Sequence, residues 1–218
     1  MTATLERPGH WTISRYHLFT QCPFRYYLRH IEKHDEGPKS EALDRGIRTH
    51  DKLEKFFLGK GPLPRVAKEF AEEYLSLRVA GVVPEQLWTF TKSWKPTKQR
   101  GWLVMKTDLY KRSKNEALVV DFKTGKIYDK NIEQMEVYAA GSFAKWPALQ
   151  HVRVELHYLD KKHIKEGEFT RKQGAELRAK WTELGNNLLA TTEFPPRPSP
   201  LCGWCPYAGK QCRFAMQP

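Results

Sequence analysis

The stretch 102–125, WLVMKTDLYKRSKNEALVVDFKTG, decides the fold of this chain. Two runs rich in β-branched and aromatic residues, 102–111 and 116–123, flank the polar turn Ser113-Lys114-Asn115. Runs of this composition, separated by a few turn-forming residues, are typical of a β-hairpin. We therefore expect two adjacent antiparallel strands here.

The same stretch carries two acids and a lysine that the hairpin would bring together. Asp108 lies within the first strand, and Asp121 and Lys123 lie near the end of the second. Residues two apart in a strand project from the same face, so Asp121 and Lys123 are expected to lie side by side. The simplest interpretation is a surface strand with a salt bridge.

The residues before Asp121 favour a second interpretation. Residues 117–120 are apolar, so this strand is expected to be buried up to Asp121, and Gly125 lets the backbone turn directly afterwards. A pair of carboxylates at the exit of a buried strand is costly unless a cation lies between them. With Lys123, the pair could hold a divalent cation and activate water against a phosphodiester.

Outward from the hairpin, the periodicity predicts helices and strands of an α/β domain with a mixed sheet and helices packed about it. The other predicted strands are 86–94 and 151–160. The predicted helices are one starting at Ser14 and interrupted at Cys22-Pro23, then 40–58, 64–80, 130–145 and 171–190, before a loop at 194–200.

Two details of the helices can be checked against the structure. Ser14 and Ser40 are expected to cap the helices that follow them, because serine accepts a hydrogen bond from the first free backbone amides. The helix at 40–58 has apolar residues at helical spacing, which predict a stripe facing the core: Leu43, Ile47, Leu53, Phe56 and Phe57.

Length and composition exclude several classes of protein. At 218 residues the chain is expected to form a single domain, residues 1–218. No apolar run approaches the roughly 20 residues needed to cross a bilayer, and the start MTATLERPGHW lacks the pattern of a secretory signal. We therefore expect a cytoplasmic protein with no membrane partner.

The formal net charge is +12, and the basic residues are densest between Lys92 and Lys114. This segment holds eight lysines and arginines against a single acid, Asp108, with Trp94 and Trp102 interleaved. Basic residues interleaved with aromatic ones suit a nucleic acid, since the cations pair with phosphates and the rings can stack on bases. The alternative interpretation is a solubilising face.

Four cysteines are placed unevenly along the chain. Cys202, Cys205 and Cys212 lie close together near the C-terminal end, while Cys22 stands alone near the start. In a reducing compartment this spacing is more typical of a metal site than of disulfides. If Cys22 is the fourth ligand, the site ties segment 1–30 to segment 194–218. Zinc and an iron–sulfur cluster both suit four thiolates, and the spacing does not distinguish them.

Taken in order, the motifs resemble those of the PD-(D/E)xK nuclease superfamily. Within it they are most similar to RecB-type exonucleases with a four-cysteine cluster, which include CRISPR-associated adaptation nucleases and phage relatives. The resemblance rests on five motifs: Gly46-xxx-His50-xxx-Glu54, Asp108, Asp121-Phe122-Lys123-Thr124-Gly125, Gln134-xxx-Tyr138, and Cys22 with Cys202, Cys205 and Cys212.

The resemblance implies a restriction-endonuclease-like core and a role for each motif. His50, Asp108, Asp121 and the carbonyl of Phe122 would hold Mg²⁺ or Mn²⁺, and Lys123 would act on the attacking water or the phosphate. Gln134 and Tyr138 would line the active site. The four cysteines would bind a [4Fe–4S] cluster, which the resemblance favours over zinc. The role of Glu85, at the start of the first strand, is left open.

The function implied is a metal-dependent exonuclease that acts on single-stranded DNA or DNA ends in recombination, repair or replication. DNA is then the expected partner, and a homo-oligomer or a recombination protein is a further one. A hypothesis of another class is a non-catalytic nucleic-acid-binding protein stabilised by a four-cysteine metal site.

Overall fold

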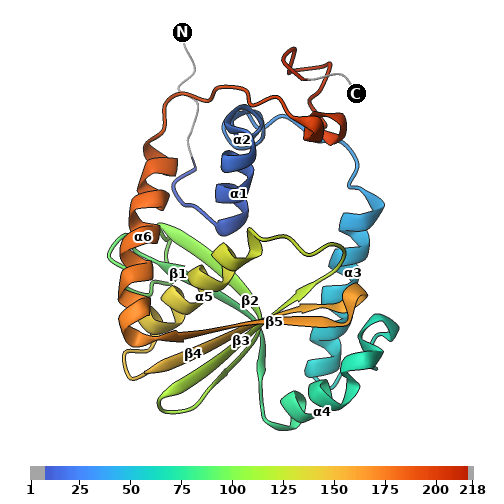
Figure 1. Ribbon diagram of the computed structural model, residues 1–218, viewed down its shortest axis with the longest axis vertical. Coiled ribbons are helices and arrows are strands. Elements are labelled where there is room, and N and C mark those ends of the chain that lie inside the picture. The colour runs from blue at the N-terminus through green and yellow to red at the C-terminus, as the bar shows by residue number, and fades with distance from the viewer. Residues whose placement is uncertain (1–7, 216–218) are drawn as a thin grey trace.

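The computed structural model describes residues 8–215 and contains one five-stranded mixed sheet (Figure 1). The strand order follows the sequence, and all neighbouring pairs are antiparallel except β3 and β4, which are parallel. The strands are β1 (Val83–Phe90), β2 (Leu103–Arg112), β3 (Glu116–Lys123), β4 (His151–Tyr158) and β5 (His163–Thr170). The α/β class and the mixed sheet flanked by helices are therefore confirmed.

Two hydrophobic clusters fill the space between the sheet and the helices on its two faces. The larger cluster packs under α1 (Ile13–Gln21), α2 (Pro23–His30), α5 (Asn131–Lys145) and α6 (Arg171–Ala190). The smaller one packs under α3 (Glu41–Phe57), the 3-10 helix η1 (Arg65–Phe70) and α4 (Ala71–Val79). Two short 3-10 segments, Leu159–Lys161 and Pro200–Trp204, complete the described elements.

The parallel pair β3 and β4 positions the polar residues at the end of β3. A parallel pair needs a crossover, which α5 supplies, so α5 begins shortly after β3 ends. The β2–β3 hairpin turns where expected, and Ser113 N donates to Glu116 O at 2.8 Å. Asp121 and Lys123 thus lie at the C-terminal end of β3, beside the first turns of α5.

The structure corrects several element boundaries. The first strand is Val83–Phe90 rather than 86–94, and the predicted helix 64–80 is divided into η1 and α4. Strand β5 was not predicted, because its sequence HIKEGEFT is strongly charged, as an edge strand tolerates. The cap of α1 is Thr12, whose side chain accepts from Arg15 N, rather than Ser14, whereas Ser40 caps α3 as predicted.

The predicted core stripe of α3 is correct for only part of the helix. Leu53, Phe56 and Phe57 are buried against the sheet, but Leu43 is 52% exposed and Ile47 is 40% exposed. The two exposed residues lie in the N-terminal half of α3, away from the smaller hydrophobic cluster.

The basic segment Lys92–Lys114 does not form the stacking surface that its sequence suggested. Trp94 is only 6% exposed and donates its ring N–H to Thr182, and Trp102 packs edge-on against Trp11. Both rings therefore belong to the packing of the larger cluster. The eight basic side chains are exposed. Four of them precede β2, three lie within it and one lies in the hairpin turn. Among residues 8–215, no helix is long and apolar enough to span a membrane.

Candidate active site and cysteine-lined cavity

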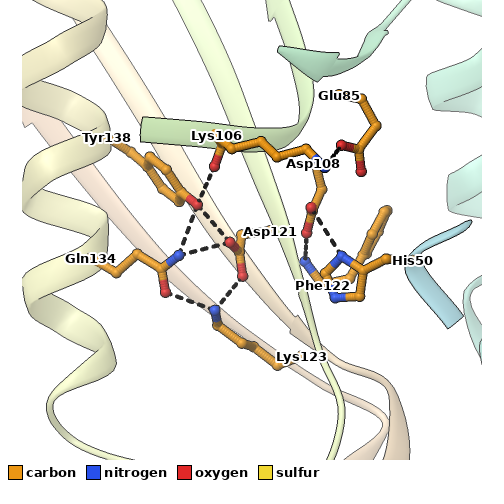
Figure 2. Close-up of polar contacts among 9 residues, drawn as sticks. All are labelled: His50, Glu85, Lys106, Asp108, Asp121, Phe122, Lys123, Gln134 and Tyr138. Carbon is orange, nitrogen blue, oxygen red and sulfur yellow. Dashed lines mark hydrogen bonds and ion pairs between the residues drawn. The ribbon is translucent and has the colours of Figure 1, made fainter. Parts of the chain in front are cut away.

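Asp121, Lys123, Gln134 and Tyr138 form one hydrogen-bonded network between β3 and α5 (Figure 2). Lys123 Nζ lies 2.5 Å from Asp121 Oδ2 and donates to Gln134 Oε1 at 2.7 Å. The Gln134 amide donates to Asp121 Oδ1 at 2.8 Å and to the Tyr138 hydroxyl at 2.7 Å. The predicted pairings within the strand and along one helix face are both present.

The Tyr138 hydroxyl connects this network to β2. It lies 2.6 Å from Asp121 Oδ1 and 2.8 Å from the carbonyl oxygen of Lys106. Because Tyr138 is buried in the hydrophobic cluster, it fixes the Asp121 carboxylate to the sheet through a rigid ring.

A second group of ligand-type side chains lies beside this network, around Asp108. His50 Nδ1 on α3 lies 3.0 Å from Asp108 Oδ1, and Phe122 N donates to Asp108 Oδ2 at 2.7 Å. Glu85 on β1 completes a group in which one ligand atom each from His50, Glu85 and Asp108 lie within 4.8 Å of one another. Asp121 is not a member of that group.

The strands are irregular where these carboxylates lie. The β1–β2 register pairs Pro84 with Leu109 and Gln86 with Thr107, but Glu85 and Asp108, opposite each other, do not pair. The β2–β3 ladder likewise ends at Leu109 and Val120. Beyond that point the Asp108 carboxylate, instead of a β2 carbonyl, accepts the hydrogen bond of Phe122 N.

Burial and neighbouring charge shift the pKa values of Asp108 and His50. Burial raises the pKa of Asp108, and the nearby Asp121 raises it further, whereas His50 and the Phe122 amide oppose the shift. Burial lowers the pKa of His50, but its hydrogen bond to Asp108 and the charges of Asp108 and Asp121 outweigh burial, so the net shift is upward. The two carboxylates therefore interact, and extra positive charge at this point would stabilise both ionised forms.

The residues present fit a divalent cation. Asp121 is 4% exposed, and its Oδ2 atom is in ion-pair contact with Lys123 but lacks a partner in hydrogen-bonding geometry. Carboxylate oxygens with incomplete hydrogen bonding, next to an imidazole and further carboxylates, are the ligand set that Mg²⁺ or Mn²⁺ accepts.

The structure also gives a position to two residues whose part in the site the sequence did not define. Glu85, whose role was left open, pairs with Lys106 Nζ, and Lys106 also supplies the carbonyl near Tyr138. The sequence indicates for Lys106 only a place in the basic segment Lys92–Lys114. Glu85 could have been assigned to the site only from its position opposite Asp108 in the antiparallel β1–β2 pair. That position depends on the strand register, which the sequence does not determine.

The four cysteines, one from the N-terminal segment and three from the C-terminal segment, come together at one cavity. Cys22, Cys202, Cys205 and Cys212 all line one cavity of about 30 Å³, and all four are free thiols. Burial raises the pKa of the Cys205 thiol, and the nearby Cys212 and Cys22 add to the shift. Close approach of the N- and C-terminal segments is thus present in the structure.

The comparison with protein-family models agrees with this geometry. The model of the PD-(D/E)XK nuclease superfamily matches residues 10–103 and 101–213. No curated protein matches the chain. A solved structure, described as the crystal structure of SSO0001, aligns with 99% of this chain and 91% of that chain, at 14% sequence identity and a TM-score of 0.47. Since the family match extends over nearly the whole described sequence, the chain belongs to the PD-(D/E)XK nuclease superfamily of metal-dependent nucleases.

Proposed function

We propose that this protein is a divalent-metal-dependent DNA exonuclease that acts on single strands or DNA ends. The observation that carries the proposal is the fixed position of Lys123, held between Asp121 and Gln134, beside the group of His50, Glu85 and Asp108. A structural salt bridge would not need four further polar side chains around it in a largely buried position.

In this proposal Asp108, Asp121, His50 and the Phe122 carbonyl hold Mg²⁺ or Mn²⁺, and Glu85 is an additional ligand. A divalent cation bound here would polarise the scissile phosphate and lower the pKa of a bound water. The protein's part is to orient these oxygens: Phe122 N and His50 fix Asp108, while Tyr138 and Gln134 fix Asp121.

Lys123 has the catalytic role that needs a positive charge near the phosphate. Its Nζ is held by Gln134 Oε1 and Asp121 Oδ2, so its position is set before substrate binds. From there it can orient the attacking water or stabilise charge that builds on the phosphate in the transition state. Gln134 acts as a positioning residue for Lys123.

We also propose that the cysteine-lined cavity holds a [4Fe–4S] cluster with a structural role. Four free thiols from the two ends of the chain line one cavity. Four thiolates brought together in this way are the ligand set of such a cluster, which supports the proposal.

The test of the nuclease is release of nucleotides from end-labelled linear single-stranded DNA in Mg²⁺, in Mn²⁺ and in EDTA. A circular single strand of the same length is run in parallel, as are the variants Lys123→Ala and Asp108→Asn. Lys60→Ala, at an exposed lysine beyond the end of α3, is the matched control. Thermal melting of each variant establishes that it is folded.

We expect metal-dependent degradation of the linear strand, loss of activity on the order of a hundredfold or more in both site variants, and no loss in Lys60→Ala. Cleavage of the circular strand at an equal rate would overturn the exonuclease assignment. Binding without cleavage in every metal, from protein with its cysteine site loaded, would instead support a non-catalytic nucleic-acid-binding protein.

A further inference from the structure

The N-terminal half of α3 exposes apolar side chains on the same helix face that carries active-site residues. Ile47 and Leu43 precede His50 by three and seven residues, so they lie one and two turns from it on that face. Glu54, one turn beyond His50, contributes charge at Lys106. The face thus continues from the catalytic carboxylates outward along α3.

The loop that follows Lys123 lies against this half of α3. A Cβ placed on Gly46 would lie 3.3 Å from Thr124 Oγ1, so helix and loop are in contact there. Asp160 joins the two, since it pairs with Arg45 on α3 and accepts from Gly125 N at 2.8 Å. Figure 1 shows the segment between β3 and α5 running beside the upper part of α3.

This loop is also exposed and partly apolar. Tyr128 is 52% exposed, as an aromatic side chain just five residues after Lys123. The loop carries two exposed lysines, Lys126 and Lys130, against one acid, Asp129. An apolar and aromatic surface next to cations, adjacent to a phosphodiester-cleaving site, matches the two chemical parts of a nucleic-acid strand.

We propose that Leu43, Ile47 and Tyr128 form an apolar wall that receives the unstacked bases of a single strand as its backbone enters the active site. The proposal rests on the proposed function. Bases in a duplex are paired and stacked inside, so they cannot contact the wall, whereas those of a single strand can. The loop lysines pair with the phosphates. The wall therefore selects single strands and frayed ends.

The test is the affinity of the full chain for a short labelled oligothymidine and for a blunt duplex, measured in EDTA so that no strand is cut. The wall variant is Leu43→Gln with Ile47→Gln. The matched control is Leu75→Gln with Val79→Gln, which changes two exposed apolar residues four apart on α4. Tyr128→Ser and Tyr128→Phe form a second pair, because phenylalanine keeps the ring.

We expect the wall variant and Tyr128→Ser to bind the single strand about tenfold more weakly, and the control and Tyr128→Phe to bind as the unaltered protein does. Duplex affinity should not change. The dependence of single-strand affinity on salt should keep its slope, since no charge has been removed, whereas Lys126→Ala with Lys130→Ala should reduce that slope.

Unchanged single-strand affinity in the wall variant would overturn the proposal, and so would an equal loss for single strand and duplex. A changed oligomeric state with unchanged DNA binding would also overturn it and assign the wall to a second copy of the chain. Failure of the wall proposal is distinguished from failure of the proposed function by hydrolysis of a small chromogenic phosphodiester in Mn²⁺, which needs only the metal site. Retained hydrolysis would mean that the nuclease assignment stands and that only the wall is wrong.

Discussion

Glu85 is the residue at which backbone strain and the candidate active site coincide. Its φ of 52° lies in the left-handed region, which costs a residue with a Cβ about 1–3 kcal/mol. The same residue interrupts the β1–β2 pairing and places its carboxylate near His50 and Asp108. The strained backbone therefore occurs at the residue whose carboxylate joins His50 and Asp108, which supports a functional role for the Glu85 side chain.

Replacing Glu85 by glutamine keeps the shape of the side chain and removes its charge. If the carboxylate binds the cation, the Mn²⁺ concentration that gives half-maximal nuclease activity should rise at least about tenfold. The measurement is a Mn²⁺ titration of activity, with Glu72→Gln on the exposed side of α4 as the control. An unchanged titration would restrict Glu85 to its ion pair with Lys106.

His30 predicts a second effect at the scale of one residue. Its ring packs on Tyr26 with centroids 5.1 Å apart, and burial together with Arg15, Arg29 and His10 lowers its pKa from 6.5 to about 4. In the unfolded chain the ring takes up a proton near pH 6.5, before the folded protein can. The contribution of His30 to the free energy of unfolding is therefore full above pH 6.5 and is lost as the pH falls toward 4.

We expect His30→Gln to reduce this part of the acid sensitivity. Because the ring is only half-buried, the pH-dependent loss attributable to it should be about 1 kcal/mol between pH 7.5 and pH 5. Urea unfolding of both proteins at several pH values measures the difference. Parallel pH profiles for the two proteins would show that His30 takes up its proton at the same pH in the folded and the unfolded chain. His30 would then contribute nothing to the pH dependence of stability.

At the scale of elements, glycine sets how closely α6 approaches the N-terminal segment. A Cβ on Gly185 would lie 2.4 Å from the Trp11 ring nitrogen and 2.8 Å from Trp102. Trp11 is fully buried and stacks on Trp181, with ring centroids 5.8 Å apart, so it has no free space to move into.

Gly185→Ala should therefore destabilise the protein by about 2 kcal/mol, although alanine is the better helix former. Chemical denaturation gives the free energy of unfolding. Gly9→Ala, where nothing lies within 4 Å of the added carbon, is the control and should be close to neutral. A more stable Gly185→Ala would mean that α6 can shift away from Trp11 without cost.

The elements also show how far the sequence could predict this molecule. Hairpin β2–β3, helix α5 and the contacts of Asp121 with Lys123 and of Gln134 with Tyr138 were predictable, because the two contacts depend on spacings of two and four residues. The position of Glu85 in the site was not predictable, because it depends on the left-handed backbone conformation of Glu85 itself. The exposure of Leu43 was not predictable either, since spacing defines a helix face but not how far the sheet extends beneath it.

At the scale of the whole molecule, the two ends of the chain are held together at the cysteine-lined cavity. Tyr207 is fully buried and donates its hydroxyl to His34 O at 3.1 Å, and Arg197 donates to Thr20 O. Phe194 packs on Tyr26 and Tyr27. These contacts hold the tail beyond α6, and a bound cluster would stabilise it further.

If the cavity holds the proposed cluster, Cys22→Ser and Cys212→Ser should each abolish iron binding and loosen both ends of the chain together. We expect faster tryptic cleavage after Arg25 and after Lys210 alike, while a fragment spanning α3 to α6 resists digestion. Limited proteolysis with mass spectrometry measures this, alongside iron and sulfide analysis of anaerobically prepared protein. Trp204→Ala, at an 81% exposed residue between two of the cysteines, is the control. Faster cleavage at only one end would contradict the shared anchor.

The sequence separations within the active site bear on the order in which it is assembled during folding. The hydrogen bonds of Asp108 with Phe122, and of Asp121 with Gln134 and Tyr138, join residues 14, 13 and 17 positions apart. The contact of His50 with Asp108 closes a loop of 58 positions. Short loops close at lower entropic cost. We expect the carboxylates and lysine to gather first in a local unit of strands and helix, and His50 to arrive last, when α3 docks.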